Sequence, residues 1–336
     1  MRVPADLAGE RLDRAVAALG GRTLGREVSR RQARRWIEAG QVFVEGRPVR
    51  IASRTVAAGA RLEIVPSVES GPGPPALEPE RILFEDPHLL AVDKPAGVAV
   101  QAHRQSTVDH LQAMAEHHLA ERLGHTVRLE LVHRLDRGTS GVVLFAKDTE
   151  TAGRLGRAFQ EREVTKTYQA VVAVVDPWPP DAWTVQDVLA MERLGNGRRR
   201  AVRVDTGPPS TPDGNGRPTL DGNGRPKPDG DGRPAYTEFR LHQRLHRSAW
   251  VEARPITGRT HQIRVHLATD GWPILGDRLY GPRYGPGEAP SGYPQRPLLH
   301  ASRLALEHPH TGRPIVVESP IPPDFEAWVD QHPSMV

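Results

Sequence analysis

The stretch HRLDRGTSG, residues 133–141, gathers four ionisable side chains directly before small residues that are typical of a tight turn. Asp136 has an arginine on either side, Arg134 and Arg137. Two guanidinium groups this close favour the ionised carboxylate, which suits a nucleophile or a base and suits a general acid poorly. The residues alone leave two interpretations open: a catalytic aspartate, or an ion-pair network that closes a β-turn.

The sequence on both sides of this stretch is strand-like. The runs VRLELV (127–132) and VVLFAK (142–147) predict two strands with the charged stretch as the loop between them. Further out, LLAVDKPAGVAV (89–100) predicts a strand, a Lys-Pro-Ala-Gly turn and a second strand, and KTYQAVVAVV (166–175) predicts another strand. Asp148 is a good N-cap for a helix through TAGRLGRAFQ. We therefore expect an α+β domain around a mixed, mainly antiparallel sheet.

The C-terminal third repeats this mixture. In VEARPITGRTHQIRVHLATDG (251–271), Thr257 or Thr260 is placed to cap a short helix that buries Ile263 and Leu267, although alternation also allows a strand. Residues 298–320 predict two strands around a His-Pro-His-Thr-Gly turn. Residues 195–235 are rich in turn formers, with DGNGRP twice and DGDGRP once, and predict a low-complexity, disordered insertion outside the active site.

Length and composition exclude several classes of protein. The 336 residues contain no cysteine, so disulfides and thiolate metal sites are impossible and a reducing cytoplasm is expected. The longest apolar run, YQAVVAVV (168–175), is far shorter than a membrane span requires, and no leader sequence is visible. Residues 1–66 hold 13 arginines against 7 acidic residues, an excess of 6, whereas the whole chain has a net charge of +4. A basic N-terminal segment is typical of a module that binds phosphates.

The N-terminal segment divides into short elements. SRRQARRWIEAG (29–40) predicts a helix with an apolar stripe and an arginine face made of Arg30, Arg31, Arg34 and Arg35, and QVFVEGRPVR (41–50) predicts a hairpin. The expected domains are a small α/β RNA-binding module (1–66), a linker (67–81), a catalytic domain (82–325) that contains the 195–235 insertion, and a tail (326–336).

Several familiar sites have no support. No phosphate-binding GxxxxGK[ST] or GxGxxG motif is present, and Ser140 lacks the strand-to-helix context of a nucleophile elbow. His261 and His266 are five residues apart and no carboxylate cluster joins them, so we expect no metal and no cofactor. The DGNG repeats lack the bidentate glutamate of a calcium loop. No second acidic residue lies in a motif comparable to that of Asp136, which argues against a glycoside hydrolase that acts on nucleosides.

Two resemblances add to these observations. Residues 10–66 resemble the S-four type of RNA-binding module, first seen in a ribosomal small-subunit protein. The ordered motifs of residues 82–320 are similar to those of RluA-type pseudouridine synthases; they are KPAGV (94–98), HRLDRGTSG, KTYQAVV (166–172), TGRTHQIRVH (257–266), GWPILGDRLYG (271–281) and LLHASRL (298–304).

The second resemblance implies an activity. In such enzymes the N1–C1′ bond of a uridine in RNA breaks, the uracil turns, and C5 joins C1′, after the nucleotide has been flipped out of its stack. The resemblance implies that Asp136 is the essential aspartate at the ribose, that Tyr168 packs on the uracil, and that Arg264 pairs with the aspartate. Arg134 and Arg137 would then face the RNA.

The remaining motif residues have expected structural roles. Leu279 and Tyr280 would shape the pocket, and the loop geometry would depend on His133, Gly138, Thr139 and Gly141. We expect a monomeric enzyme whose partner is ribosomal or transfer RNA. The alternative is a non-catalytic RNA-binding or ribosome-assembly factor of the same fold.

Overall fold

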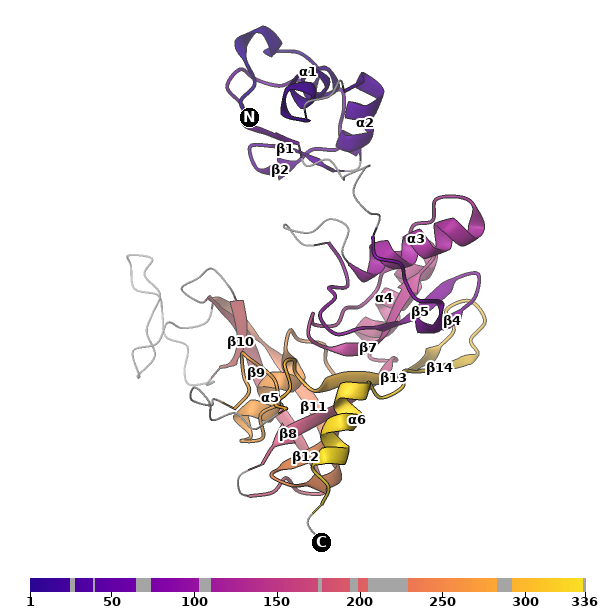
Figure 1. Ribbon diagram of the computed structural model, residues 1–336, viewed down its shortest axis with the longest axis vertical. Coiled ribbons are helices and arrows are strands. Elements are labelled where there is room, and N and C mark those ends of the chain that lie inside the picture. The colour runs from indigo at the N-terminus through magenta and orange to yellow at the C-terminus, as the bar shows by residue number, and fades with distance from the viewer. Residues whose placement is uncertain are drawn as a thin grey trace, which may run out of the picture. The chain divides into compact units, whose positions relative to one another are not determined.

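The computed structural model of the chain (Figure 1) describes residues 1–24, 28–38, 40–64, 74–102, 110–174, 177–193, 199–204, 229–282 and 292–334. It divides into two compact units, Met1–Pro75 and Ala76–Val336. No helix among these described residues has the length and apolar composition needed to cross a bilayer.

The first unit packs two helices against a small antiparallel sheet. A short 3-10 helix, η1 (Ala5–Leu7), precedes α1 (Leu12–Leu24) and α2 (Arg30–Glu38), and the sheet has the order β2-β1-β3. Its strands are β1 (Val42–Val44), β2 (Arg47–Pro48) and β3 (Leu62–Ile64). The predicted helix and hairpin are confirmed: Ala33, Trp36 and Ile37 are buried, and the β1–β2 turn is formed by Glu45 and Gly46, both with positive φ.

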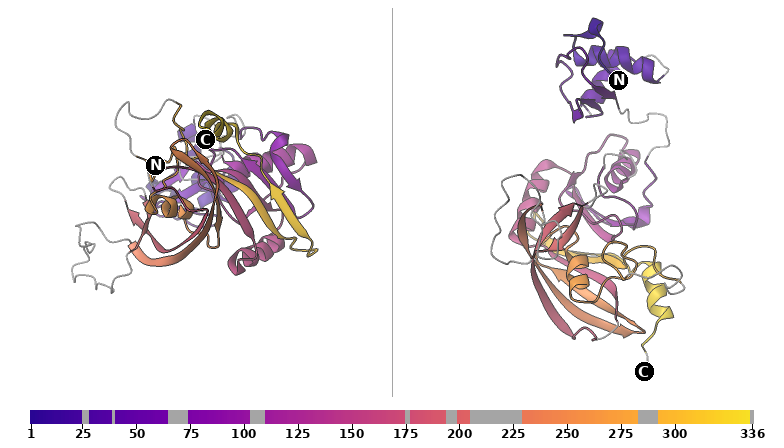
Figure 2. Two further views of the ribbon diagram at one scale, coloured as in Figure 1. Left: turned by 90° about the horizontal axis from the view of Figure 1, so that it is seen from below. Right: turned by 90° about the vertical axis from the view of Figure 1, so that its left-hand side faces the viewer.

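The second unit is built on one long, strongly curved sheet (Figure 2). Its main path runs β10-β9-β11-β12-β8-β13-β7-β5-β4, with β14 beside β13 and β6 beside β7. The strands are β4 (Ile82–Glu85), β5 (Leu89–Lys94), β6 (Glu130–Leu131), β7 (Ser140–Ala146), β8 (Thr165–Ala173), β9 (Ala182–Arg193), β10 (Arg199–Arg203), β11 (Asp229–Leu245), β12 (Ser248–Pro255), β13 (Leu299–Glu307) and β14 (Pro314–Glu318). All the described pairings between these strands are antiparallel except β7 with β13, so the predicted mainly antiparallel α+β fold is confirmed.

Helices cover both faces of the β5–β7 part of the sheet. The helical segments are η2 (Pro79–Arg81), α3 (Leu111–Leu123), α4 (Thr149–Glu161), α5 (Gln262–Thr269) and α6 (Pro323–Gln331). Val143 and Phe145 of β7 share a core with α3, whereas Val142 and Leu144 share one with Leu155 of α4. Because β7 is buried on both faces, its sequence is apolar throughout and does not alternate.

The loop assignment and two helix predictions are confirmed. Residues 132–139 connect β6 to β7, so the charged stretch is a loop that ends in the first residues of a buried strand. Asp148 caps α4 by accepting a hydrogen bond from the Thr151 amide at 2.7 Å. Helix α5 buries Ile263 and Leu267 as expected.

The predicted cap of α5 is wrong. Neither Thr257 nor Thr260 caps the helix, because the N-cap is His261, in the left-handed conformation with φ +57°. Thr257 instead accepts a hydrogen bond from the Tyr236 amide and donates one to the Gln262 side chain.

Three predicted boundaries are corrected by the structure. The predicted insertion contains regular structure, because β10 and the start of β11 fall inside 195–235. Strand pairing uses main-chain groups, so the polar run RRAVR of β10 pairs with β9. The DGNGRP repeats and residues 67–73 of the predicted linker lie outside the described residues. The predicted linker extends too far, because Leu77 is already part of the core, and the predicted tail begins too early, because Trp328 of α6 is buried.

The second strand predicted after the Lys-Pro-Ala-Gly turn is also absent. Among residues 95–102, the structure shows a single isolated bridge, between Ala99 and His110. The backbone here makes other bonds: Gly97 donates its amide hydrogen to the Arg137 carbonyl, and the Val98 carbonyl accepts a hydrogen bond from Lys94.

Gly141 permits the close approach of β7 to β13. Its φ is +110°, and a Cβ at this position would lie 2.2 Å from the Ala301 carbonyl oxygen. Only glycine satisfies both the backbone angle and the space, so strand packing requires the last glycine of the GTSG sequence.

We predict that Gly141→Ala destabilises the chain by at least about 2 kcal/mol, because it adds a backbone clash to an unfavourable φ. Denaturant unfolding measures this effect. Gly153→Ala is the matched control, since Gly153 lies inside α4 with no heavy atom within 4 Å of a built Cβ. A helical alanine there should be neutral or stabilising by up to about 1 kcal/mol. Equal stabilities of the two variants would contradict the role of Gly141.

Candidate active site

The second unit contains a pocket of about 660 Å³, and Asp136 is one of the residues that line it. This volume lies in the range of sites for small organic ligands. The walls come from the β6–β7 loop, the C-terminal half of α4, the start of β8, and the segment that joins β12 to α5. Segments that are far apart in the sequence thus surround one carboxylate.

The partner of Asp136 is Arg264, which is distant in the sequence. Arg264 Nη1 donates a hydrogen bond to Asp136 Oδ2 at 2.9 Å. The other edge of the same guanidinium binds Asp277 in bidentate fashion, at 2.7 Å from Nε and 2.8 Å from Nη2. Asp136 keeps 28% of its side chain exposed, whereas that of Asp277 is fully buried. The shared guanidinium therefore fixes a partly exposed carboxylate against a fully buried one.

The charges in this triad reinforce one another. Burial alone would lower the pKa of Arg264, but the hydrogen bonds and charges of Asp277 and Asp136 outweigh it and raise the pKa. Burial would raise the pKa of Asp277, but the bonds from Arg264 and two backbone amides lower it. Arg264 and Asp277 therefore remain charged throughout the physiological pH range.

Tyr168 lies on β8, opposite Ala253 of β12, and its side chain lines the pocket. Burial and the nearby charge of Asp136 raise the pKa of its hydroxyl, so it stays protonated at neutral pH. A half-buried aromatic ring beside the carboxylate is a suitable platform for a displaced base.

The two arginines of the charged loop differ in position. Arg134 is exposed and lines the pocket. Arg137 is exposed but is not among the pocket residues, and its Nε donates a hydrogen bond to the Gly97 carbonyl at 2.6 Å. The two neighbours in the sequence are therefore not what holds Asp136; that contact comes from Arg264.

Lys94, of the KPAGV motif, contacts the backbone of the β6–β7 loop. Its side chain is fully buried, and its ammonium group donates hydrogen bonds to the carbonyls of Pro95, Val98 and Arg137 at 2.9, 2.9 and 3.3 Å. Burial lowers the pKa of Lys94 to about 7. The Lys-Pro turn is thereby tied to the residue that follows Asp136.

His133 has the structural role expected from the sequence. Its Nε2 accepts a hydrogen bond from the Leu144 amide at 2.9 Å, and its ring stacks on Phe159. Burial lowers the pKa of His133 to about 4, so the ring is neutral.

Sequence reasoning missed three residues of the site: Lys94, Asp277 and His261. Lys94 and Asp277 lie inside the quoted motifs KPAGV and GWPILGDRLYG, but no local pattern assigns them a contact. His261 was considered only as a zinc ligand, whereas its Nε2 lies 3.7 Å from Asp136 Oδ2.

The basic face of the first unit surrounds a buried acid. Asp13 is 1% exposed and receives hydrogen bonds from Arg11 at 3.0 Å, Arg30 at 3.4 Å and Arg34 at 3.5 Å. The hydrogen bond from Arg11 lowers the pKa of Asp13 despite its burial. Arg31 is exposed on the same helix, and the side chain of Arg35 lies outside the described part of the chain.

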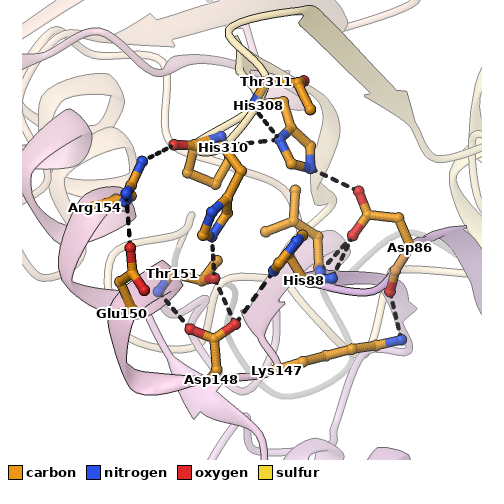
Figure 3. Close-up of polar contacts among 12 residues, drawn as sticks. Asp86, His88, Lys147, Asp148, Glu150, Thr151, Arg154, His308, His310 and Thr311 are labelled. Atoms are coloured by element: carbon orange, nitrogen blue, oxygen red, sulfur yellow. Dashed lines mark hydrogen bonds and ion pairs between the residues drawn. The ribbon is translucent and has the colours of Figure 1, made fainter.

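A second polar cluster lies outside the pocket lining (Figure 3). His88, Asp148 and His310 place three atoms that could bind a metal within 4.8 Å of one another. The two imidazoles stack at 3.9 Å, and Thr151 Oγ1 joins His310 Nε2 to Asp148 at 2.8 and 2.6 Å. Asp148 caps α4, where the positive end of the helix dipole opposes a cation. We interpret the cluster as a polar connection between three turns.

Asp86 and His308 organise the two loops that carry the histidines of this cluster. Asp86 Oδ1 accepts the amide hydrogens of His88 and Leu89, both at 2.7 Å, and its Oδ2 lies 2.8 Å from His308 Nε2. His308 Nδ1 accepts the amide hydrogen of His310 at 3.1 Å. A pair of side chains thus ties the β4–β5 turn to the β13–β14 turn.

Comparison with known proteins agrees with the fold. The family model described as RNA pseudouridylate synthase matches residues 88–269, and the S4 domain model matches residues 10–62. "Ribosomal large subunit pseudouridine synthase D" of Pseudomonas aeruginosa is 32% identical over 334 residues, covering 96% of this chain and 92% of the relative. The protein of the same name from Nitrosomonas europaea is 33% identical over 335 residues, covering 97% and 86%.

A solved structure shows the same architecture. "Human RNA Pseudouridylate Synthase Domain Containing 4" has a TM-score of 0.55 and 27% identity, covering 75% of this chain and 92% of that one. Fold, pocket and matches together define an isomerase that acts on RNA. The chain belongs to the RNA pseudouridylate synthase family, with an N-terminal S4 domain. The family resemblance and the function expected from the sequence are thereby confirmed.

We predict that Arg264→Lys lowers turnover about 100-fold, because a lysine cannot bridge both oxygens of Asp277 and still reach Asp136. Pseudouridine formation in a synthetic RNA measures this loss. Arg254→Lys is the control, since Arg254 is an exposed arginine outside the pocket lining. If both variants turn over at the same rate, the guanidinium bridge is not needed.

Proposed function

We propose that the chain converts a uridine of large-subunit ribosomal RNA to pseudouridine, with Asp136 as the catalytic group. Two observations support the choice of RNA: the relatives that match nearly the whole chain are named as ribosomal large subunit pseudouridine synthases, and the S4 domain has a basic face. Transfer RNA is the alternative substrate. Mapping pseudouridines in cells with and without the gene distinguishes the two, since the missing modification identifies the RNA.

The observation that carries the catalytic proposal is the Asp136–Arg264 pair at the wall of an open pocket. Asp136 acts at the ribose of the flipped nucleotide, as a nucleophile at C1′ or as a base. Tyr168 supports the uracil while it turns, and Arg264 fixes the carboxylate rotamer. Arg134 enters the space near the displaced base or holds a phosphate. Arg137 contacts RNA from the outer side of the loop.

We predict that Asp136→Asn lowers turnover by at least about 10³-fold, whereas its affinity for RNA changes less than about threefold. The asparagine keeps the size of the side chain and loses the negative charge. Single-turnover conversion measures the first quantity and filter binding the second. Conversion at the wild-type rate would remove Asp136 from catalysis.

The same experiment tests the non-catalytic alternative. An RNA-binding or assembly factor of this fold would bind RNA equally well in wild-type and Asp136→Asn forms and convert uridine in neither. The intact set of Asp136, Tyr168 and Arg264 around one pocket favours the enzyme.

For the S4 domain, we propose that Arg30, Arg31, Arg34 and Arg35 of α2 contact phosphates. Arg11 stays beside Asp13, so removing one arginine of the face does not leave that buried carboxylate unpaired. In a plot of the logarithm of RNA affinity against the logarithm of salt concentration, each phosphate contact adds about 0.7–0.9 to the steepness of the downward slope.

We predict that the double variant Arg31→Gln, Arg34→Gln lowers the salt slope of RNA binding by about 1.4–1.8. Titrations of binding at several salt concentrations measure this slope. The matched control removes two exposed arginines of the second unit, Arg254→Gln and Arg313→Gln. Identical slopes for the two double variants would place the phosphate contacts elsewhere.

A further inference from the structure

A chain of hydrogen bonds runs from strand β10 to the pocket through Tyr280 and His261. The Tyr280 hydroxyl donates a hydrogen bond to the Ala201 carbonyl at 3.0 Å and accepts one from the Ala201 amide at 2.8 Å. His261 Nδ1 lies 2.9 Å from the same hydroxyl oxygen. We assign the single proton of the hydroxyl to the carbonyl, and His261 Nδ1 is then the donor in this contact.

This arrangement determines the tautomer of His261. With the proton on Nδ1, Nε2 of the neutral ring carries a lone pair, and it lies 3.7 Å from Asp136 Oδ2. His261 lines the pocket and keeps 18% of its side chain exposed. Its backbone has φ +57°, an unfavourable angle for a histidine that places the ring at the start of α5. The structure therefore presents an unprotonated nitrogen beside the catalytic carboxylate.

The reaction requires such a group. In uridine, C5 carries a hydrogen and N1 carries none, whereas in pseudouridine N1 is protonated and C5 is bonded to C1′. The new C5–C1′ bond forms with the uracil electron pair freed from N1–C1′, and the C5–H electrons then restore the ring double bond. One proton must leave C5 and one must reach N1. Because C5 is attached to C1′ when it loses its proton, the acceptor must lie close to the group that acts on the ribose.

We propose that His261 is this proton acceptor: Nε2 takes the proton from C5 and returns a proton to N1, so that the reaction needs no net proton exchange. The proposal rests on the proposed function, in which Asp136 acts at the ribose. The nearby carboxylate stabilises the imidazolium formed in between, and the Tyr280 hydroxyl holds the ring in orientation throughout.

The other titratable groups that line the pocket are less suited to this role. Tyr168 stays protonated, and His133 Nε2 is already occupied by the Leu144 amide. Lys166 also lines the pocket, and its charged ammonium group can only donate hydrogen bonds. Burial lowers the pKa of this group. The arginines of the lining have no acceptor; they are Arg134, Arg162, Arg259 and Arg264.

The charges that face His261 act in both directions. Burial lowers the pKa of His261, Asp136 and Asp277 raise it, and Arg264 and Arg134 lower it, with a net decrease. The neutral ring therefore predominates at pH 7. Turnover should fall only where pH drops below this lowered pKa, which lies under 6.5.

The decisive variant is His261→Asn, whose amide nitrogen can still donate to Tyr280 but which has no base at the Nε2 position. The substrate is an RNA whose target uridine carries hydrogen or deuterium at C5. We expect kcat to fall about 10²- to 10⁴-fold, the deuterium isotope effect on kcat to rise, and the acidic limb of the kcat–pH profile to disappear. A merely structural role would lower kcat without changing the isotope effect. His125→Asn, at an exposed histidine outside the pocket lining, should match the wild type.

The outcomes separate this inference from the proposed function. If the wild-type chain converts uridine and His261→Asn does so with unchanged kcat and isotope effect, the role of His261 is overturned and the proposed function stands. If the wild-type chain converts no uridine, the proposed function fails and the inference fails with it. If His261→Asn does not fold, Tyr280→Phe is the test instead. This variant keeps His261 but removes the hydroxyl that fixes which ring nitrogen carries the proton. A kcat–pH profile identical to that of the wild type would overturn the proposal.

Discussion

The site depends on one guanidinium shared by two carboxylates. Asp277 is fully buried, and a buried carboxylate is tolerated only when it is paired and hydrogen-bonded. Arg264 supplies the charge, and the amides of Leu279 and Tyr280 supply the further bonds. Because two of its nitrogens are held by Asp277, the guanidinium has one orientation left, and in it Nη1 meets Asp136. The buried ion pair of Arg264 and Asp277 therefore sets the position of the Asp136 carboxylate.

Further contacts around the β6–β7 loop involve main-chain groups. Lys94 donates hydrogen bonds to three backbone carbonyls, those of Pro95, Val98 and Arg137. Gly141 lets β7 approach β13 where a side chain would clash. Both residues act on backbone positions that follow Asp136 in the chain, at Arg137 and at Gly141. Asp136 directly precedes the first of these positions, and its carboxylate lies in the pocket.

The fold could be predicted largely from local patterns. Strands with a strong apolar signal, such as β7 and β8, and helices with clear caps, such as α4, were found at nearly their observed bounds. The strand β10 was missed because its stability comes from main-chain pairing with β9 and from the burial of Ala201, which no composition reports. Helix α6 was missed for a similar reason: two buried aromatic residues, Phe325 and Trp328, dock it onto the sheet.

The site was predictable only in part. Asp136, Tyr168 and Arg264 were identified through a family resemblance, and the structure places all three at one pocket. The local charge pattern indicated the wrong partners, because Arg134 and Arg137 are adjacent in sequence whereas Arg264 is 128 residues away. Contacts at such separation depend on how the sheet brings β7 and α5 together, which no window of sequence contains.

The contact between Tyr280 and β10 has a consequence for how this family can vary. The hydroxyl meets Ala201 only through its amide and carbonyl, groups that every residue except proline possesses. A small side chain at this buried position is the one requirement that this contact places on the strand. Substitutions at other positions of β10 that preserve its pairing with β9 leave the same two atoms available to the tyrosine.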